Sequence, residues 1–190
     1  DPIGRIEAAE ALAVKSSQED VALLSKLLLK ESFWGVSVRI AATLGKISGD
    51  KARDGLLKGL KAPHPKVRHG SVLALWGFKN DQKVAKALRK ISQEDPSYRV
   101  EAAALQGLGK IKESDSREFL ETAFNRPSHN NMAQSAILEA LGEIKDERSW
   151  DFLVKNSRYG APHLSRGSAM KAIARIAQRH PHRKTEAIDL

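Results

Sequence analysis

The sequence predicts an all-α protein, and more narrowly an α-solenoid: a right-handed α–α superhelix of about six short helical-hairpin repeats. Three observations carry this prediction. A two-residue landmark recurs along the chain at a nearly constant spacing. Apolar residues recur at helical spacing, and no run alternates with a period of two. The composition, with 5% aromatic residues and 7 prolines, favours helices over a β-sandwich.

The landmark is a large apolar residue followed by a small one. It occurs as Leu12-Ala13, Leu44-Gly45, Trp76-Gly77, Leu108-Gly109, Leu141-Gly142 and Ile173-Ala174. The second members are 32, 32, 32, 33 and 32 residues apart. Such a period holds two helices, and one pair of helices cannot bury both of its faces. Stacked pairs give a continuous core and a concave inner surface.

The first helix of each pair begins at a polar capping residue, such as Asp50, Asp81 or Asp146. A carboxylate at this place accepts hydrogen bonds from the free N–H groups of the first turn. The helix then carries apolar residues on one stripe, as at Val84 and Leu88. These signals predict where the first helices begin and which face they bury.

The second helix begins near a proline or another cap, because proline in the first turn loses no hydrogen bond. Six second helices are predicted, near residues 2–15, 33–47, 65–79, 96–112, 128–144 and 163–179. All belong to a single array over residues 1–180, which starts with the second helix of a pair and indicates a piece of a longer chain. Residues 181–190 are a C-terminal tail. His180 and His182 flank a proline at its start, which predicts a flexible end rather than a zinc site.

One segment of an otherwise balanced chain is strongly basic. The net charge is +9, from 32 Lys and Arg against 23 Asp and Glu. Residues 46–90 hold nine Lys and three Arg against three Asp, which is the whole excess. We expect an electropositive stretch over the second to fourth repeats, mostly on the convex side. It would solubilise the protein or dock against an acidic face.

Composition also limits the compartment and the types of site. The chain has no cysteine, so it holds neither a disulfide nor a thiolate site. No apolar run approaches the roughly 20 residues of a membrane span, and no signal peptide is visible at the start. These features predict a cytoplasmic protein with no membrane contact.

The pattern Val-Arg-x-x-Ala-x-x-Ala-Leu-Gly, with Asp-Pro just before it, resembles the short HEAT-like repeat. The resemblance extends over essentially all of residues 1–180. The column that usually holds arginine reads Arg5, Ser37, Arg68, Glu101, Gln134 and Arg166. Half of these positions are not arginine, so we do not expect an unbroken Arg–Asp ladder between successive repeats.

A narrower resemblance lies in Phe33-Trp34-Gly35-Val36 and the following Ile40-Ala41-Ala42-Thr43-Leu44-Gly45. This string is similar to a repeat in the C-terminal helical domain of bacterial aminopeptidase-N-like zinc metallopeptidases. The resemblance implies a non-catalytic interaction domain that covers the catalytic chamber and helps to bind peptide substrate. Its partners would be the catalytic domain of the parent chain and a peptide or protein ligand.

No catalytic residue, metal ligand or cofactor site is predicted on this chain itself. The aminopeptidase family needs a His-Glu-x-x-His string for zinc, and the sequence lacks it. If the resemblance holds, zinc and catalysis belong to a catalytic domain outside these residues. We therefore expect no enzyme activity from the chain alone.

The second helices usually line the concave surface of a solenoid, so their polar positions are candidate contacts. The candidates are Trp34, Arg39, His69, Gln106, Lys110, Glu139, Lys171 and Arg175. Trp34 begins a second helix beside Phe33, where it either touches a ligand at the concave rim or packs in the turn between helices. Trp76 stands in the leucine column, which indicates core packing rather than ligand stacking.

Two further function classes fit a basic array of short repeats. One is a nucleic-acid-binding protein of the alkylpurine DNA glycosylase type, which would need a basic concave groove with a catalytic Asp and aromatic residues. The basic residues instead fall mostly on first helices and turns, namely Lys51, Arg53, Lys58, Lys61, Lys83, Lys86, Arg89 and Lys90. The other is a stand-alone protein-binding scaffold or a lyase-like repeat protein.

Overall fold

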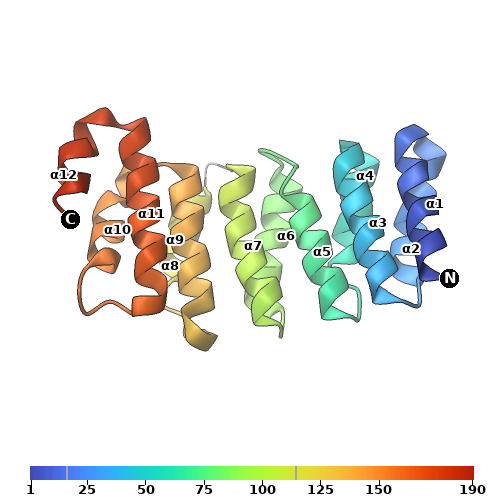
Figure 1. The fold of residues 1–190 in the computed structure, drawn as a ribbon, viewed down its shortest axis with the longest axis horizontal. Coiled ribbons are helices and arrows are strands. Elements are labelled where there is room, and N and C mark those ends of the chain that lie inside the picture. Colours follow the sequence, from blue (N-terminus) through green and yellow to red (C-terminus); the bar gives the residue numbers. More distant parts are fainter. Residues whose placement is uncertain (16, 114) are drawn as a thin grey trace.

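The computed structural model of the protein describes residues 1–15, 17–113 and 115–190. It confirms the all-α solenoid, and the described residues contain no strand. The helices stand side by side in two layers, from α1 at the N-terminal end of the array to α12 at the other end (Figure 1).

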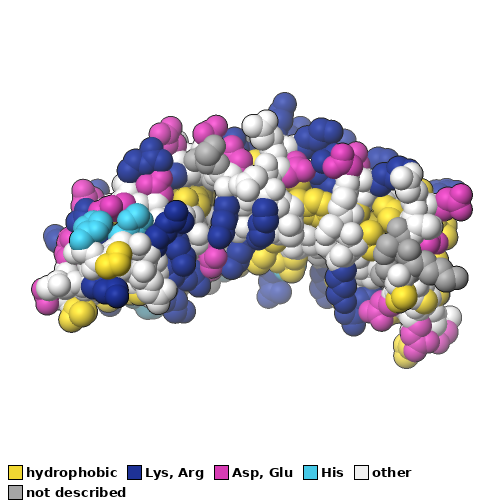
Figure 2. All heavy atoms as spheres, turned by 90° about the horizontal axis from the view of Figure 1, so that it is seen from above, with side chains coloured by type: hydrophobic (Ala, Val, Ile, Leu, Met, Phe, Trp, Pro, Cys, Tyr) yellow, Lys and Arg dark blue, Asp and Glu magenta, His cyan; other side chains and the backbone are white. Residues whose placement is uncertain are grey.

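The second helices form one layer and the first helices the other. The second helices are α1 (Pro2–Lys15), α3 (Trp34–Ile47), α5 (Pro65–Leu75), α7 (Tyr98–Ile111), α9 (Met132–Ile144) and α11 (His163–Arg179). The first helices are α2 (Gln18–Lys30), α4 (Gly49–Gly59), α6 (Gln82–Glu94), α8 (Ser116–Ala123) and α10 (Trp150–Ser157). Seen from above the array is an arch, with the second helices on its hollowed side (Figure 2).

Two second helices depart from their predicted bounds. α5 ends at Leu75, whereas the sequence predicted a helix to residue 79. α9 begins at Met132, after a short 3-10 turn, η1 (His129–Asn131), and not near residue 128. Asn130 and Asn131 have positive φ angles of 49° and 54°, a left-handed conformation that an α-helix cannot contain. This turn therefore delays the start of α9.

The C-terminal segment, expected to be a flexible end, is folded. It forms a 3-10 turn, η3 (Pro181–Arg183), and a short helix, α12 (Lys184–Ile188). The indole N–H of Trp150 donates a 2.8 Å hydrogen bond to Glu186. Arg183 pairs with Glu147 at 2.8 Å. These contacts join the segment to α10 and to the turn before it, and periodicity could not reveal them because they lie outside the repeat.

The apolar column of the landmark forms the centre of the core. Leu12, at the N-terminal end, is half-buried, whereas five of its members are almost fully buried: Leu44, Leu75, Leu108, Leu141 and Ile173. In the third repeat this place belongs to Leu75 and not, as the sequence register suggested, to Trp76. Burial of such a side chain contributes about 1.5–3 kcal/mol, so each buried member of the column stabilises the array.

Glycines beside that column let neighbouring second helices touch backbone to backbone. A Cβ atom on Gly109 would lie 2.5 Å from Cα of Ala140, on the adjacent helix. Gly142 and Gly45 face the next helix in the same way, with closest distances of 2.7 and 2.9 Å. Packing this close excludes any side chain, so the glycine column sets the spacing of the array.

The third repeat solves the same packing problem differently. Trp76 stands where the other repeats have glycine, and Gly77 has only ordinary contacts, at 3.8 Å. The bulk of the indole is accommodated on the next helix by Gly107, whose Cβ would lie 2.7 Å from the indole nitrogen. In this repeat the large residue, Trp76, therefore lies on the earlier helix, and the glycine that makes room for it, Gly107, lies on the next one.

Two of the three arginines in the column, Arg5 and Arg68, make ion pairs between repeats. Arg68 binds Asp95 through two hydrogen bonds of 2.6 and 3.0 Å, and the Asp95 side chain is only 3% exposed. Arg5 makes an equivalent, more exposed pair with Glu31 at 3.1 Å. A two-pronged arginine–carboxylate contact fixes the relative orientation of the two turns that carry it.

At two of the three positions without arginine, Glu101 and Gln134, the side chain makes other polar contacts. Glu101 inverts the charge and binds Arg126 of the following repeat at 2.8 Å. Gln134 donates to the backbone carbonyls of Phe124 and Arg126. A contact between successive repeats therefore persists at Glu101, whereas the bonds of Gln134 lie within its own α8–α9 hairpin.

Of the three predicted capping aspartates, two cap helices. Asp81 accepts a 3.0 Å hydrogen bond from the N–H of Val84 at the start of α6. Asp146 accepts a 2.9 Å bond from Arg148 at the start of the 3-10 turn η2 (Glu147–Ser149), which precedes α10. Asp50 instead lies inside the first turn of α4 and pairs with Arg53 at 2.9 Å.

Lowering the pH is expected to destabilise the protein partly through Asp81. Burial raises the pKa of this carboxyl, but the hydrogen bonds from Val84 and Arg53 and the charge of Arg53 outweigh it, so the net pKa lies below 3.8. A lowered folded-state pKa contributes stability above the unfolded pKa of about 4, and this stability is lost as the pH falls through the folded value. Thermal unfolding of the wild type and Asp81→Asn from pH 7 downward tests this. The gap in Tm should shrink in acid, and a constant gap would contradict the assignment.

Candidate functional site

Six second-helix residues and Trp76 line a cavity on the concave side of the arch. Its volume is about 250 Å³. It is lined by Trp76, Gln106, Lys110, Glu139, Ala140, Glu143 and Arg175. Trp76 follows α5, and the other lining residues come from α7, α9 and α11. The cavity therefore spans four successive repeats.

Two short chains of polar contacts cross the floor of this cavity. Gln106 donates a 2.6 Å hydrogen bond to Glu139, which also accepts one of 3.2 Å from Ser168. One turn further along, Glu143 pairs with Lys110 at 2.9 Å and with Arg175 at 3.1 Å. Each series of contacts runs from α7 through α9 to α11. The carboxylates on α9 therefore bind donors from both neighbouring helices.

The carboxyl of Glu143 is held in its charged form. Burial raises its pKa, but the hydrogen bond and charge of Lys110, with the charges of Arg175 and Lys145, outweigh burial and lower the net pKa. The side chains of Lys110, Glu143 and Arg175 are 38%, 23% and 39% exposed. Groups exposed to this extent remain available for exchange with a ligand's own charges.

An aromatic wall closes the end of the cavity at Trp76. Its indole N–H donates a 3.2 Å hydrogen bond to the carbonyl of Ala103, which fixes the orientation of the ring. The side chain is half-buried, so one part packs on the core and another part borders the cavity. The prediction of core packing for Trp76 therefore describes only part of its environment.

The structure brings half of the predicted contact residues together. Gln106, Lys110, Glu139 and Arg175 line the one cavity. Lys171 lies one turn before Arg175 on α11 and is exposed. Sequence spacing alone could place them on one face, but their contacts depend on which helices are neighbours.

The remaining three candidates lie elsewhere on the second helices. Arg39 pairs with Glu10 of α1 at 3.2 Å, and both side chains are about half exposed. His69 on α5 is half-buried, and its pKa is lowered, first by burial and then by the charge of Arg99. These groups are separate from the cavity and stay untested as contacts.

Trp34 packs in the turn between helices. Its ring stacks on His64 with centroids 5.5 Å apart, and the amine of Lys66 lies 3.8 Å from the ring centroid. Because the Trp34 ring packs against an imidazole and a cation, it stabilises the turn and does not form an open binding surface. This favours the second of the two roles that the sequence left open for Trp34.

Sequence reasoning missed Glu143, although a signal for it exists. Glu143 directly follows the small residue of its landmark pair, as Lys110 and Arg175 follow theirs. Equivalent positions in stacked repeats lie in one row across the helices. Comparison of these equivalent positions along the sequence identifies Glu143 as an acid between two bases, Lys110 and Arg175.

The basic segment lies mostly on the other side of the arch. Its members on first helices and the turn after α4 are Lys51, Arg53, Lys58, Lys61, Lys83, Lys86, Arg89 and Lys90. Basic side chains are visible along the convex edge over the middle of the arch (Figure 2). The concave cavity, in contrast, has acids and bases in alternation.

No group of three or more histidine, aspartate or glutamate side chains is arranged to hold a metal ion in the part of the chain that the structure describes. Over the same residues, no helix combines the length and apolar character that crossing a membrane requires.

Comparison with known families decides the classification. A family model of HEAT repeats matches residues 1–75, 53–138 and 85–174, in overlapping stretches that span nearly the whole array. The chain belongs to the HEAT-repeat family. The HEAT-like pattern in the sequence is thereby confirmed. No curated protein sequence matches this HEAT-repeat chain significantly.

Solved structures similar to the HEAT-repeat chain are repeat proteins of low sequence identity. An engineered protein superposes with a TM-score of 0.54 at 19% identity, over 94% of this chain and 92% of its own. A designed armadillo repeat protein in complex with the peptide (KR)4 gives 0.49 at 16% identity, over 90% and 92%. The complex of CpcE and CpcF of phycocyanin lyase from Nostoc sp. PCC7120 gives 0.44 at 19%, over 97% and 85%. Such likeness concerns the fold alone.

Proposed function

We propose that this HEAT-repeat chain is a non-catalytic binding module that holds an extended peptide segment of a partner protein in its concave cavity, without a cofactor. The observation that carries the proposal is the row of alternating charges on α7, α9 and α11 beside Trp76. Stacked repeats present such rows along a continuous groove, which suits an extended ligand.

The chemistry of the lining supports a peptide ligand. A peptide backbone needs both donors and acceptors, and the cavity offers amide, ammonium and guanidinium donors with two carboxylate acceptors. The indole of Trp76 offers apolar contact for one side chain. The described residues that line the cavity include no serine, cysteine or histidine, so they offer no Ser–His or Cys–His pair.

Selection from a library of random peptides tests this proposal. Peptides enriched on the immobilised chain are measured by fluorescence anisotropy against the wild type, Gln106→Ala and Arg175→Gln. Each substitution removes a donor in the cavity and should weaken binding by about tenfold. The control Lys155→Gln lies on α10, in the outer layer, and should leave affinity unchanged. Peptides that bind both cavity variants as well as the wild type would refute the site.

A finer version of the proposal assigns the chain to an aminopeptidase-N-like zinc peptidase, as the domain that covers the catalytic chamber. It rests on sequence resemblance, chiefly of Phe33-Trp34-Gly35-Val36 and the following Ile40-Ala41-Ala42-Thr43-Leu44-Gly45. The coding sequence upstream of Asp1 tests this version: a His-Glu-x-x-His string supports it, and an upstream domain of another class contradicts it.

A further inference from the structure

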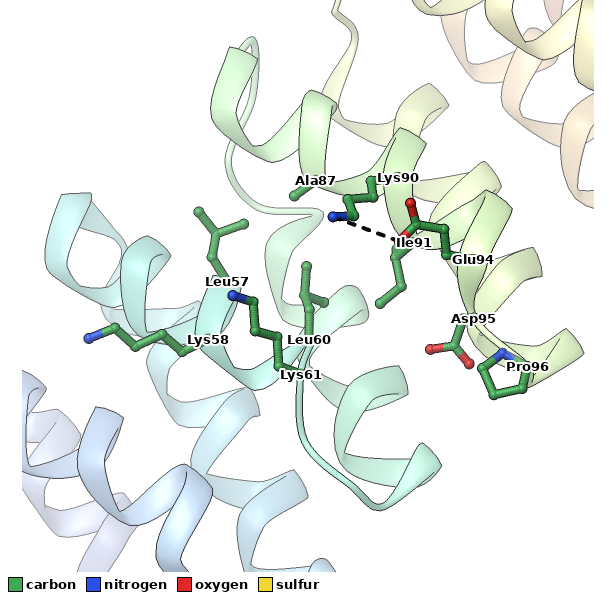
Figure 3. A pocket seen from close by; sticks show the side chains of 10 residues that line it. All are labelled: Leu57, Lys58, Leu60, Lys61, Ala87, Lys90, Ile91, Glu94, Asp95 and Pro96. Carbon is green, nitrogen blue, oxygen red and sulfur yellow. Dashed lines mark ion pairs between the residues drawn. The ribbon is translucent and has the colours of Figure 1, made fainter.

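An apolar groove crosses the convex face between the C-terminal halves of α4 and α6, in the layer opposite to the concave cavity. Its volume is about 540 Å³. Leu57 and Leu60 from the α4 side and Ile91 from α6 line it, and Leu60 and Ile91 face each other across it (Figure 3). Ala87 also lines the groove, and its small side chain leaves room that a larger residue would fill.

Basic side chains border this groove on both sides. Lys61 follows α4 and Lys90 lies on α6, and both are in the groove lining (Figure 3). Lys83 shares the helix face of Ala87 and Lys90, at four- and seven-residue spacing, and continues the basic edge toward the start of α6. The rim is therefore positive along both of its edges.

The acids near the groove do not neutralise this rim. Asp95 is engaged by Arg68 through two hydrogen bonds. Glu94 reaches Lys90 at 3.8 Å, and both side chains are more than 60% exposed, at 64% and 71%. Lys61 makes no ion pair among the residues that the structure describes. The exposed pair of Glu94 and Lys90 contributes little to stability at this distance, and Lys90 can easily exchange it for another carboxylate.

We propose that this groove binds an acidic amphipathic helix of a partner protein. The apolar face of such a helix, with anchors at i, i+3, i+4 and i+7, would fill the space between Leu57 and Ile91. Its glutamate or aspartate flanks would meet Lys61 on one side and Lys90 on the other. The proposal concerns a second surface, on the face opposite the peptide-binding cavity, and is independent of it.

The lining favours a peptide helix over nucleic acid. Nucleic-acid sites combine basic residues with phosphate contacts along their whole length and often with aromatic stacking platforms. Here the floor is aliphatic, and the described lining contains no aromatic side chain. An aliphatic floor with charged edges instead complements an amphipathic helix, which has an apolar face flanked by charged residues.

Two labelled peptides of about 18 residues, roughly five helical turns, provide the test. One carries leucines at the anchor positions with glutamates on both flanks, and the other has lysine in place of each glutamate. Fluorescence anisotropy is measured at about 150 mM salt, where exposed charges more than a Debye length apart are largely screened. We expect micromolar binding of the acidic peptide and none of the basic one.

Matched variants locate the binding. Charge reversal on both edges, Lys61→Glu with Lys90→Glu, should weaken binding of the acidic peptide by about tenfold or more. Ala87→Trp fills the groove without changing charge and should do the same. The control Lys155→Glu changes an exposed lysine on α10, outside the groove, and should leave affinity within about twofold. Because the lysines are exposed, the double variant remains a fair test if Ala87→Trp fails to fold, which its far-ultraviolet spectrum would reveal.

Three outcomes would overturn the proposal. One is no binding of the acidic peptide to the wild type, or equal binding of both peptides. Another is acidic-peptide binding that the folded groove variants leave unchanged. The third is stronger binding of labelled duplex DNA at the same salt, lost in the lysine variant, which would assign the surface to nucleic acid.

Discussion

Replacing Arg68 with alanine is expected to lower the free energy of unfolding by about 3–5 kcal/mol. The reason is that Asp95, 3% exposed, would lose the arginine that binds it through two hydrogen bonds and remain as a buried, unpaired charge. Arg68 also donates to the backbone carbonyls of Ala62 and Pro63, at 3.0 and 2.9 Å. Urea unfolding monitored by circular dichroism measures the loss.

An ion pair on the surface serves as a control that separates the effect of burial on stability from the effect of losing a charge. Arg39→Ala removes the pair with Glu10, in which both partners are about half exposed, and should cost at most about 1 kcal/mol. Adding Asp95→Asn to Arg68→Ala removes the buried charge and should restore part of the lost stability. Equal losses for Arg68→Ala and Arg39→Ala would show that the Arg68 pair does not join the repeats as described.

Gly109→Ala is the second substitution with a large expected effect, a loss of about 2–3 kcal/mol. The new Cβ atom would lie 2.5 Å from Cα and from the carbonyl oxygen of Ala140. Both are backbone atoms, so α7 and α9 would have to move apart, and the cavity that they line would open. The same urea titration measures this change.

Gly167→Ala is the control, because it is also a helical glycine but has open space at its Cβ position. There the change should stabilise the protein by about 0.5–1 kcal/mol, since alanine is the better helix former. If Gly109→Ala were as harmless as Gly167→Ala, close helix contact would not explain the glycine column.

The periodicity of the landmark pairs was sufficient to predict the solenoid, because a repeated buried column leaves few other ways to stack helices. Its register failed at Trp76, where a large residue stands in the small column. Nothing in a single repeat shows that Gly107, on the next second helix, provides the space. The folded C-terminal segment was missed for a related reason: Glu186 binds Trp150 outside any repeating pattern.

The sequence could predict which helix face carries the concave cavity, but not which residues of that face meet in it. Helical spacing places Gln106 and Lys110 on one face, and the second-helix rule assigns that face to the concave surface. Which candidates meet depends on the spacing of three neighbouring helices, which the glycine contacts set. Glu143 could have been found from its equivalence with Lys110 and Arg175, whereas Arg39 and His69 share the face but lie in other repeats.

The three indole N–H groups of the chain offer the most direct test of peptide binding at the concave cavity. Trp76 borders the cavity, Trp34 lies in a turn, and Trp150 is buried on α10 with its N–H bound to Glu186. A proton–nitrogen correlation spectrum of the wild type, titrated with a library-selected peptide, resolves one indole signal for each. Binding at the concave cavity should shift the Trp76 signal and leave those of Trp34 and Trp150 in place. Saturable binding that shifts Trp34 or Trp150 and leaves Trp76 unchanged would contradict binding at this cavity.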